Sequence, residues 1–170
     1  MKEMIIARSK FIEKHGKLDT KSDKVQVEGH IESYKNLGNS YHFSSDYLNA
    51  LKNLKKALKI SESNNIAKVR LYFEIGNILI ETEEFKAAIN ILTQGFKLEP
   101  TLGGFPFKLG ICYEQLTEYK KAIENYILCA KLRKDDAGLE HKPTQDVIKE
   151  AIRLAKQTNN ENLLPEWMNK

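Results

Sequence analysis

The stretch that decides the fold is residues 72–79, which read YFEIGNIL. In it Gly76 follows a large aliphatic residue, and a third large residue stands three positions later. The arrangement recurs around Gly38 in residues 34–41 (YKNLGNSY) and around Gly110 in residues 106–113 (PFKLGICY). The glycines are 38 and 34 residues apart. A period of this length indicates one structural unit copied along the chain.

Matching positions continue outward from each glycine. An aromatic residue stands nine positions later and an alanine twelve positions later, followed by a large residue at sixteen and a small one at nineteen. In chain order these columns hold Tyr47, Phe85 and Tyr119; Ala50, Ala88 and Ala122; Leu54, Leu92 and Tyr126; and Ala57, Gly95 and Cys129. Small residues let two helices approach closely and large ones fill the space between neighbours, so each copy predicts two antiparallel helices.

This pattern resembles the tetratricopeptide repeat (TPR), which has the signature W-x2-L-G-x2-Y, then A-x3-F and P. The resemblance implies an all-α, right-handed superhelix of helix pairs, each a helix A followed by a helix B. It divides the chain into an N-terminal helical extension and linker (1–30), three TPR motifs (31–64, 69–102 and 103–136), and a C-terminal capping helix with an apolar tail (137–170). Pro106 in an aromatic column and the longer first interval depart from the family pattern.

Local signals refine these boundaries. The four extra residues fall near positions 61–65 and predict a lengthened first B helix or a wider loop. Pro106 is expected in the first turn of its helix, where proline is tolerated. Residues 16–22 are polar and predict a linker, and Thr144 is the expected N-cap of the capping helix. Two further sets share a helix face: Met4, Ile5, Phe11 and Ile12 near the N-terminus, and Val147, Ile148, Ala151, Ile152 and Ala155 near the C-terminus.

Composition argues against several classes of protein. The 170 residues are 41% hydrophobic, which is too apolar for a disordered chain, and a net charge of +4 is mild for a nucleic-acid binder. The sequence shows no signal-peptide core and no apolar run of membrane-spanning length. Cys112 and Cys129 fit no disulfide framework, so we expect reduced thiols in a cytoplasmic protein.

The sequence predicts a protein that is not an enzyme and has no cofactor. The motifs HExxH, GxSxG, GxGxxG and the P-loop are absent, and no two histidines share a helix face at the spacing of metal ligands. No neighbouring cation is evident that would activate either cysteine. We therefore expect no catalytic residue, no metal site and no small-molecule substrate.

The resemblance implies a concave groove lined by A-helix side chains. The expected lining is Glu32, Lys35, Asn39, His42 and Phe43 from the first repeat, Arg70, Phe73, Asn77, Ile80 and Glu81 from the second, and Gly104, Phe107, Lys108, Ile111, Glu114 and Gln115 from the third. Phe43, Phe73 and Phe107, with Ile80 and Ile111, would form an apolar floor, which either a partner segment or the protein's own termini would cover. We expect an adaptor that captures a protein or peptide segment there.

More specific roles stay open. Lys35 and Asn39 resemble the opening of carboxylate-clamp TPRs, which bind the C-terminal Glu-Glu-Val-Asp of heat-shock chaperones, and Lys108 falls where that family has a basic residue. Glu74 and Gly104 depart from the clamp. Residues 105–107 (FPF) resemble translocator chaperones of type III secretion, although that family is typically acidic. The alternative from another class is structural self-assembly, in which the groove accepts a terminal segment of a second copy.

A run of lysines marks the first B helix. Lys52, Lys55, Lys56 and Lys59 lie opposite Leu51, Leu54 and Leu58 on a helix. Two interpretations fit: the solvated face of an amphipathic helix, or a basic stripe for phosphate or an acidic protein.

Overall fold

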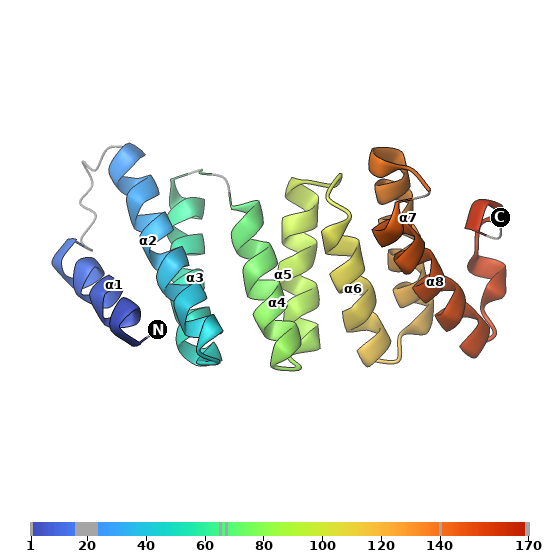
Figure 1. The fold of residues 1–170 in the computed structure, drawn as a ribbon, viewed down its shortest axis with the longest axis horizontal. Coiled ribbons are helices and arrows are strands. Elements are labelled where there is room, and N and C mark those ends of the chain that lie inside the picture. Colours follow the sequence, from blue (N-terminus) through green and yellow to red (C-terminus); the bar gives the residue numbers. More distant parts are fainter. Residues whose placement is uncertain (1, 16–23, 65, 67, 140, 169–170) are drawn as a thin grey trace. The chain divides into compact units, whose positions relative to one another are not determined.

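The computed structural model describes residues 2–15, 24–64, 66, 68–139 and 141–168, and every regular element among them is helical (Figure 1). The chain divides into two compact units, Met1–Thr82 and Glu83–Lys170. Each unit is described by itself below. The second repeat crosses the division, since its A helix belongs to the first unit and its B helix to the second.

The first unit consists of α1 (Lys2–His15), α2 (Lys24–Phe43), α3 (Tyr47–Ser63) and α4 (Val69–Glu81). Helix α2 packs against both α1 and α3, and α3 packs against α4. At 17 residues, α3 exceeds the 14 residues of the next B helix, which confirms the lengthened first B helix. The expected linker at 16–22 lies outside the described residues, as do the side chains of Met4, Phe11 and Ile12.

The second unit consists of α5 (Phe85–Leu98), α6 (Gly104–Gln115), α7 (Tyr119–Ala137) and α8 (Lys142–Gln157), followed by the short 3-10 turns η1 (Glu161–Leu163) and η2 (Glu166–Met168). Consecutive helices pack against one another. Pro106 lies in the first turn of α6, as expected. The predicted capping helix is α8, and its residues Val147, Ile148, Ala151 and Ala155 are buried.

The predicted N-cap of α8 is wrong. The helix begins at Lys142 with His141 as the N-cap, because Pro143 is accepted inside the first turn. Thr144 therefore lies within that turn. Its side chain is fully buried, and Oγ1 has no hydrogen-bond partner among the described residues.

Gly38 and Gly110 lie where helices A and B of their repeats meet. A methyl group added at Gly38 would lie 2.7 Å from Cγ of Leu54, and one at Gly110 would lie 2.5 Å from Cε1 of Tyr126. No side chain fits at either position without displacing its neighbour. Ala50, Ala88 and Ala122 are fully buried, as the repeat pattern predicts.

A left-handed residue ends each A helix. Ser45, Glu83 and Thr117 have φ near +60° and stand seven positions after the three repeat glycines. The same conformation recurs at Asn159 after α8, with φ of 53°. The backbone of Asp46, Glu118 and Asn160 then donates to a carbonyl five residues earlier, at 2.8–2.9 Å. The C-terminal end of α8 therefore has the same backbone geometry as the ends of the A helices.

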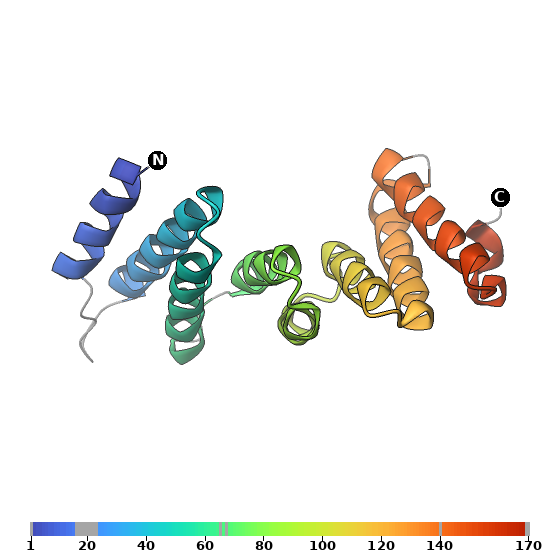
Figure 2. The same cartoon turned by 90° about the horizontal axis from the view of Figure 1, so that it is seen from below.

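The C-terminal tail packs on α8 and on α7. Figures 1 and 2 show it turning back beside the C-terminal end of α8. Met168 is 5% exposed, and Leu163, Leu164 and Trp167 pack against the same core cluster. Nζ of Lys134 on α7 lies 4.9 Å from the centre of the Trp167 ring. The tail thus completes the core of the second unit.

Candidate functional site

A small pocket lies between the A helices α2 and α4 of the first unit. Its volume is about 200 Å³. Three aliphatic side chains, Ile31, Ile66 and Leu71, form its apolar part. Its charged part consists of Glu28, Glu32, Lys35 and Arg70. The pocket therefore brings together three of the predicted groove residues, Glu32 and Lys35 from α2 and Arg70 from α4.

Ion pairs organise this charged rim. Nζ of Lys35 lies 2.6 Å from Oε2 of Glu32, and Nε of Arg70 lies 2.9 Å from Oε1 of Glu74. The hydrogen bond and charge of Lys35, with the more distant charge of Arg70, lower the pKa of the Glu32 carboxyl. The bond to Glu74 raises the pKa of Arg70. Lys35 and Arg70 are thus each paired with a glutamate on the same helix. The rim of the pocket therefore presents both acidic and basic groups.

Two acceptor atoms on α4 lack a partner. Oε2 of Glu74 and Oδ1 of Asn77 are buried and make no hydrogen bond to any described residue. Both residues share the helix face of Arg70, at spacings of four and seven residues. Buried acceptors without a donor are rare in folded proteins. Neither residue lines the α2–α4 pocket.

Near their C-terminal ends, α2 and α4 are joined by a contact between His42 and Glu81. Nε2 of His42 lies 2.8 Å from Oε2 of Glu81. The imidazole also lies near two rings, with centroids 6.3 Å from Phe43 and 5.9 Å from Tyr47. The Phe43 side chain is 77% exposed, which makes it an apolar ring available for contact. Asn39, Phe73 and Ile80 are partly buried.

The predicted groove residues of the second unit take part in packing. The Phe107 ring lies 5.9 Å from Tyr126 and 5.5 Å from the guanidinium of Arg133, both on α7. Ile111 also packs against the α7–α8 core, and Lys108 is partly buried. Phe43 and Phe73 belong to the other unit, so a floor shared by all three rings remains a prediction.

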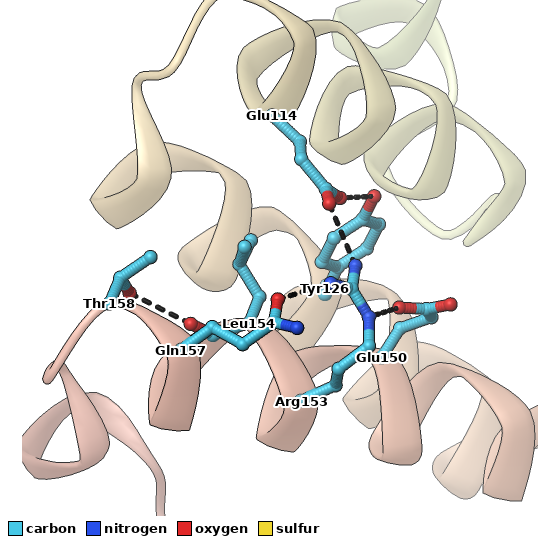
Figure 3. Close-up of polar contacts among 7 residues, drawn as sticks. All are labelled: Glu114, Tyr126, Glu150, Arg153, Leu154, Gln157 and Thr158. Carbon is cyan, nitrogen blue, oxygen red and sulfur yellow. Dashed lines mark hydrogen bonds and ion pairs between the residues drawn. The ribbon is translucent and has the colours of Figure 1, made fainter.

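A network of hydrogen bonds and ion pairs joins α6, α7 and α8 and includes the predicted groove residue Glu114 (Figure 3). Oε2 of Glu114 accepts a hydrogen bond from the Tyr126 hydroxyl at 2.9 Å, and Oε1 of Glu114 pairs with Nη2 of Arg153 at 2.7 Å. Arg153 also donates to Glu150 and Gln157, both at 2.6 Å. Burial, and then the bond to Glu114, raise the pKa of Tyr126. Both carboxylate oxygens of Glu114 are therefore engaged, one by α7 and the other by the capping helix α8.

Sequence reasoning missed this network, although one signal pointed to it. The column that holds Leu54 and Leu92 holds Tyr126 in the third repeat. A buried tyrosine hydroxyl needs a hydrogen-bond partner, so a polar group had to lie nearby.

The repeats match a known family model. The model described as tetratricopeptide repeat matches residues 31–64, 69–102 and 107–136. The chain belongs to the tetratricopeptide repeat family. The third match begins four residues after the predicted start of that TPR motif, and the first two coincide with the prediction.

Individual relatives extend the likeness beyond the three TPR motifs. Response regulator aspartate phosphatase I of Bacillus subtilis (strain 168) is 25% identical over 140 residues, which cover 77% of this chain and 35% of that protein. The apo form of RapI superposes with a TM-score of 0.69 at 20% identity, covering 85% of this chain and 54% of RapI. The TPR chain thus spans about a third and about half of these two relatives.

A second structural likeness is to a protein that this chain matches over almost its whole length. The type III secretion chaperone SycD of Yersinia enterocolitica, solved with a peptide of the translocator YopD, superposes with a TM-score of 0.68 at 16% identity. The match covers 82% of this chain and 99% of SycD. At this level of identity the likeness establishes the TPR fold.

In the described part of the chain, no helix is long and apolar enough to cross a membrane. No group of three or more histidine, cysteine or acidic side chains is placed there to hold a metal ion. Both cysteines are unpaired and buried, and burial raises the pKa of Cys129 and that of Cys112, the latter to about 11.

Proposed function

We propose that this TPR chain is a non-enzymatic adaptor that captures an extended segment of another protein on the A-helix face of α2 and α4. The observation that carries the proposal is the pocket between these helices, where an aliphatic floor adjoins an ionic rim that includes the predicted groove residues Glu32, Lys35 and Arg70. Its volume of about 200 Å³ is smaller than a typical small-molecule pocket, which suits a single side chain of a peptide.

The chemistry of the pocket narrows the kind of segment. Ile31, Ile66 and Leu71 suit an aliphatic side chain, since apolar burial supplies most of the affinity at such contacts. An acidic C-terminus suits the site poorly, because Glu28 and Glu32 would repel it.

The comparisons support peptide capture without identifying the partner. SycD was solved with a peptide of its translocator, and the TPR2B domain of yeast Sti1 was solved in a complex with pHsp70. The tail of this chain is held on α7 and α8, which favours an external partner over the chain's own tail. We also propose a cytoplasmic location, which suits the two unpaired thiols.

Peptide selection followed by a matched pair of variants tests this proposal. A displayed library of random peptides is selected on the intact chain, and the best binder is measured by calorimetry. Lys35→Ala/Arg70→Ala should weaken it about tenfold or more, a loss of about 1.4 kcal/mol. Lys55→Ala/Lys59→Ala removes the same charge from a surface outside the pocket and should change affinity less than about twofold. Equal effects of the two double variants, or no selected peptide, would count against the site.

Self-assembly is the alternative from another class, and light scattering separates it from adaptor function. A monomer at all concentrations, together with peptide binding that depends on Lys35 and Arg70, excludes it. A dimer that dissociates when the selected peptide is added would show that a second copy uses the same pocket.

A further inference from the structure

A second pocket lies among α1, α2 and α3, and its lining shares no residue with the α2–α4 pocket. Its volume is about 230 Å³. Tyr34 and Tyr41 on α2 face Lys52 and Lys56 on α3, and Glu13 on α1 lies at the edge. The two lysines are four residues apart on α3, so they share one helix face.

The positive charge of this pocket is not neutralised by an ion pair. Lys52 and Lys56 are exposed, and neither has an acidic partner within 4.0 Å among the described residues. Nζ of Lys56 lies 5.3 Å from the centre of the Tyr34 ring, which holds the ammonium at the pocket. Glu13 is the one acidic side chain of the lining, so two cations face one anion.

The polar wall beneath the lysines is fixed by hydrogen bonds. Asn53 is 8% exposed, and its Nδ2 donates to the Asn49 carbonyl at 2.8 Å. Nδ2 of Asn49 donates in turn to the Asp46 carboxylate at 2.7 Å. This wall keeps the α3 face in place, and the lysines and tyrosines of the lining can supply ammonium and hydroxyl donors.

We propose that this pocket binds a phosphate monoester group. Such a group carries a charge of about −1.5 to −2 at pH 7 and three acceptor oxygens, which match two ammonium groups and two hydroxyls better than a single carboxylate does. Lysine binds phosphate as a point charge. The pocket is too small for a whole nucleotide or cofactor, since such ligand sites hold roughly 300–1,000 Å³. The ligand is therefore one phosphate group, and this site is independent of the α2–α4 pocket.

The lysine stripe of α3 supplies its own control. Lys55 and Lys59 are as exposed as Lys52 and Lys56 but do not line the pocket. Lys52→Gln/Lys56→Gln and Lys55→Gln/Lys59→Gln change the net charge equally, and both leave the buried face of α3 intact. A diffuse electrostatic attraction would respond to both pairs alike, whereas a defined site responds to the first pair alone.

The test is a titration of the isotope-labelled full chain with inorganic phosphate at constant ionic strength, followed by NMR. We expect saturable shifts of amides in residues 49–56 and around Tyr34 and Tyr41. The affinity should fall about tenfold or more in the pocket variant and less than about twofold in the control. Tyr41→Phe should weaken binding severalfold, and Glu13→Gln should strengthen it. Shifts that never saturate, or equal losses in both lysine variants, overturn the proposal.

A second arm separates the two sources of such a group. A neutral peptide with one phosphoserine and its unphosphorylated form are compared with inorganic phosphate. Tighter binding of the phosphopeptide, with none of the plain peptide, assigns the pocket to a phosphorylated protein segment. Equal binding of phosphopeptide and inorganic phosphate assigns it to a small phosphate compound. Equal binding of both peptides contradicts phosphate recognition.

Discussion

The helix pair α2–α3 packs Gly38 against Leu54, whereas the pair α6–α7 packs Gly110 against Tyr126. The leucine side chain makes an apolar contact and needs no hydrogen-bond partner. Tyrosine brings a buried hydroxyl, which Glu114 accepts, and Glu114 in turn pairs with Arg153 on the capping helix. One aromatic substitution in a repeat column thus couples the third pair to α8.

Under the proposed function, the first unit binds a partner segment, whereas the same face of α6 in the second unit is covered by α7 and α8. In the first unit, Lys35 and Arg70 are paired along their own helices and still line an accessible pocket. In the second unit, Phe107, Ile111 and Glu114 are engaged by α7 and α8. Side chains at equivalent positions of the repeats therefore line a pocket in the first unit and pack against neighbouring helices in the second.

The largest expected effect comes from filling the tight glycine contact of the third pair. Gly110→Ala places a methyl group 2.5 Å from the buried Tyr126 ring and should destabilise the fold by about 2–3 kcal/mol. Gly38→Ala should cost about 1 kcal/mol, since a leucine side chain adapts more easily than a ring. Gly29→Ala is the control. It has open space in the middle of α2 and should stabilise by about 0.5–1 kcal/mol. Denaturant titration that ranked the three variants otherwise would contradict the assigned contacts.

Alkaline pH should act on the third pair through its two buried thiols, and the larger resolved effect is that of Cys112. Burial raises the pKa of Cys112 from 9.0 to about 11, whereas the first pair has Ser40 in the same column. The unfolded chain loses this proton above pH 9 while the folded chain keeps it, so stability falls as pH rises from 9 through 11. The expected loss is roughly 2 kcal/mol. Melting temperatures measure it, and Cys112→Ala should flatten the decline.

Two phenylalanines in the same predicted floor should behave differently. Phe107→Ala removes a ring that packs on Tyr126 and Arg133 and should cost about 1–2 kcal/mol. Phe43→Ala removes a ring that is 77% exposed and should change stability by less than about 0.5 kcal/mol. Thermal denaturation of both variants makes the comparison. Equal costs would mean that the two rings have the same environment.

The smallest of these effects concerns the capping helix. Arg153→Ala breaks the pair with Glu114 and should cost about 1 kcal/mol, because both side chains are partly exposed. Amide exchange should increase in α8 and in the tail. Lys149→Ala on the same helix is the control, since Lys149 is exposed and makes no ion pair with any described residue. Unchanged exchange in Arg153→Ala would mean that apolar packing alone holds α8.

Much of the fold could be predicted because the repeat pattern records it directly. Gly38 and Gly110 mark close contacts between helices A and B, and the alanines of the repeat pattern are fully buried. The length of α3 and the position of Pro106 also follow from local signals. The N-cap of α8 was mistaken because threonine is a common cap, while a proline beside it moved the start of the helix.

The candidate site could be predicted only in outline. Offsets from the glycines select residues on one helix face, and Lys35 and Arg70 do line one pocket. Offsets do not say which neighbour takes up a side chain, so the pairing of Arg70 with Glu74 and the packing of Phe107 were not foreseen. The Glu114–Arg153 pair joins residues 39 positions apart, and its formation depends on how α8 packs.

The most direct test of the account is amide hydrogen exchange on the intact chain with and without the selected peptide. We predict slower exchange in α2 and α4, centred on Ile31, Lys35, Arg70 and Leu71, and little change in α8 and the tail. Protection confined to α6, α7 and α8 would contradict the account, because it would place the binding surface on the helices that the network around Glu114 closes.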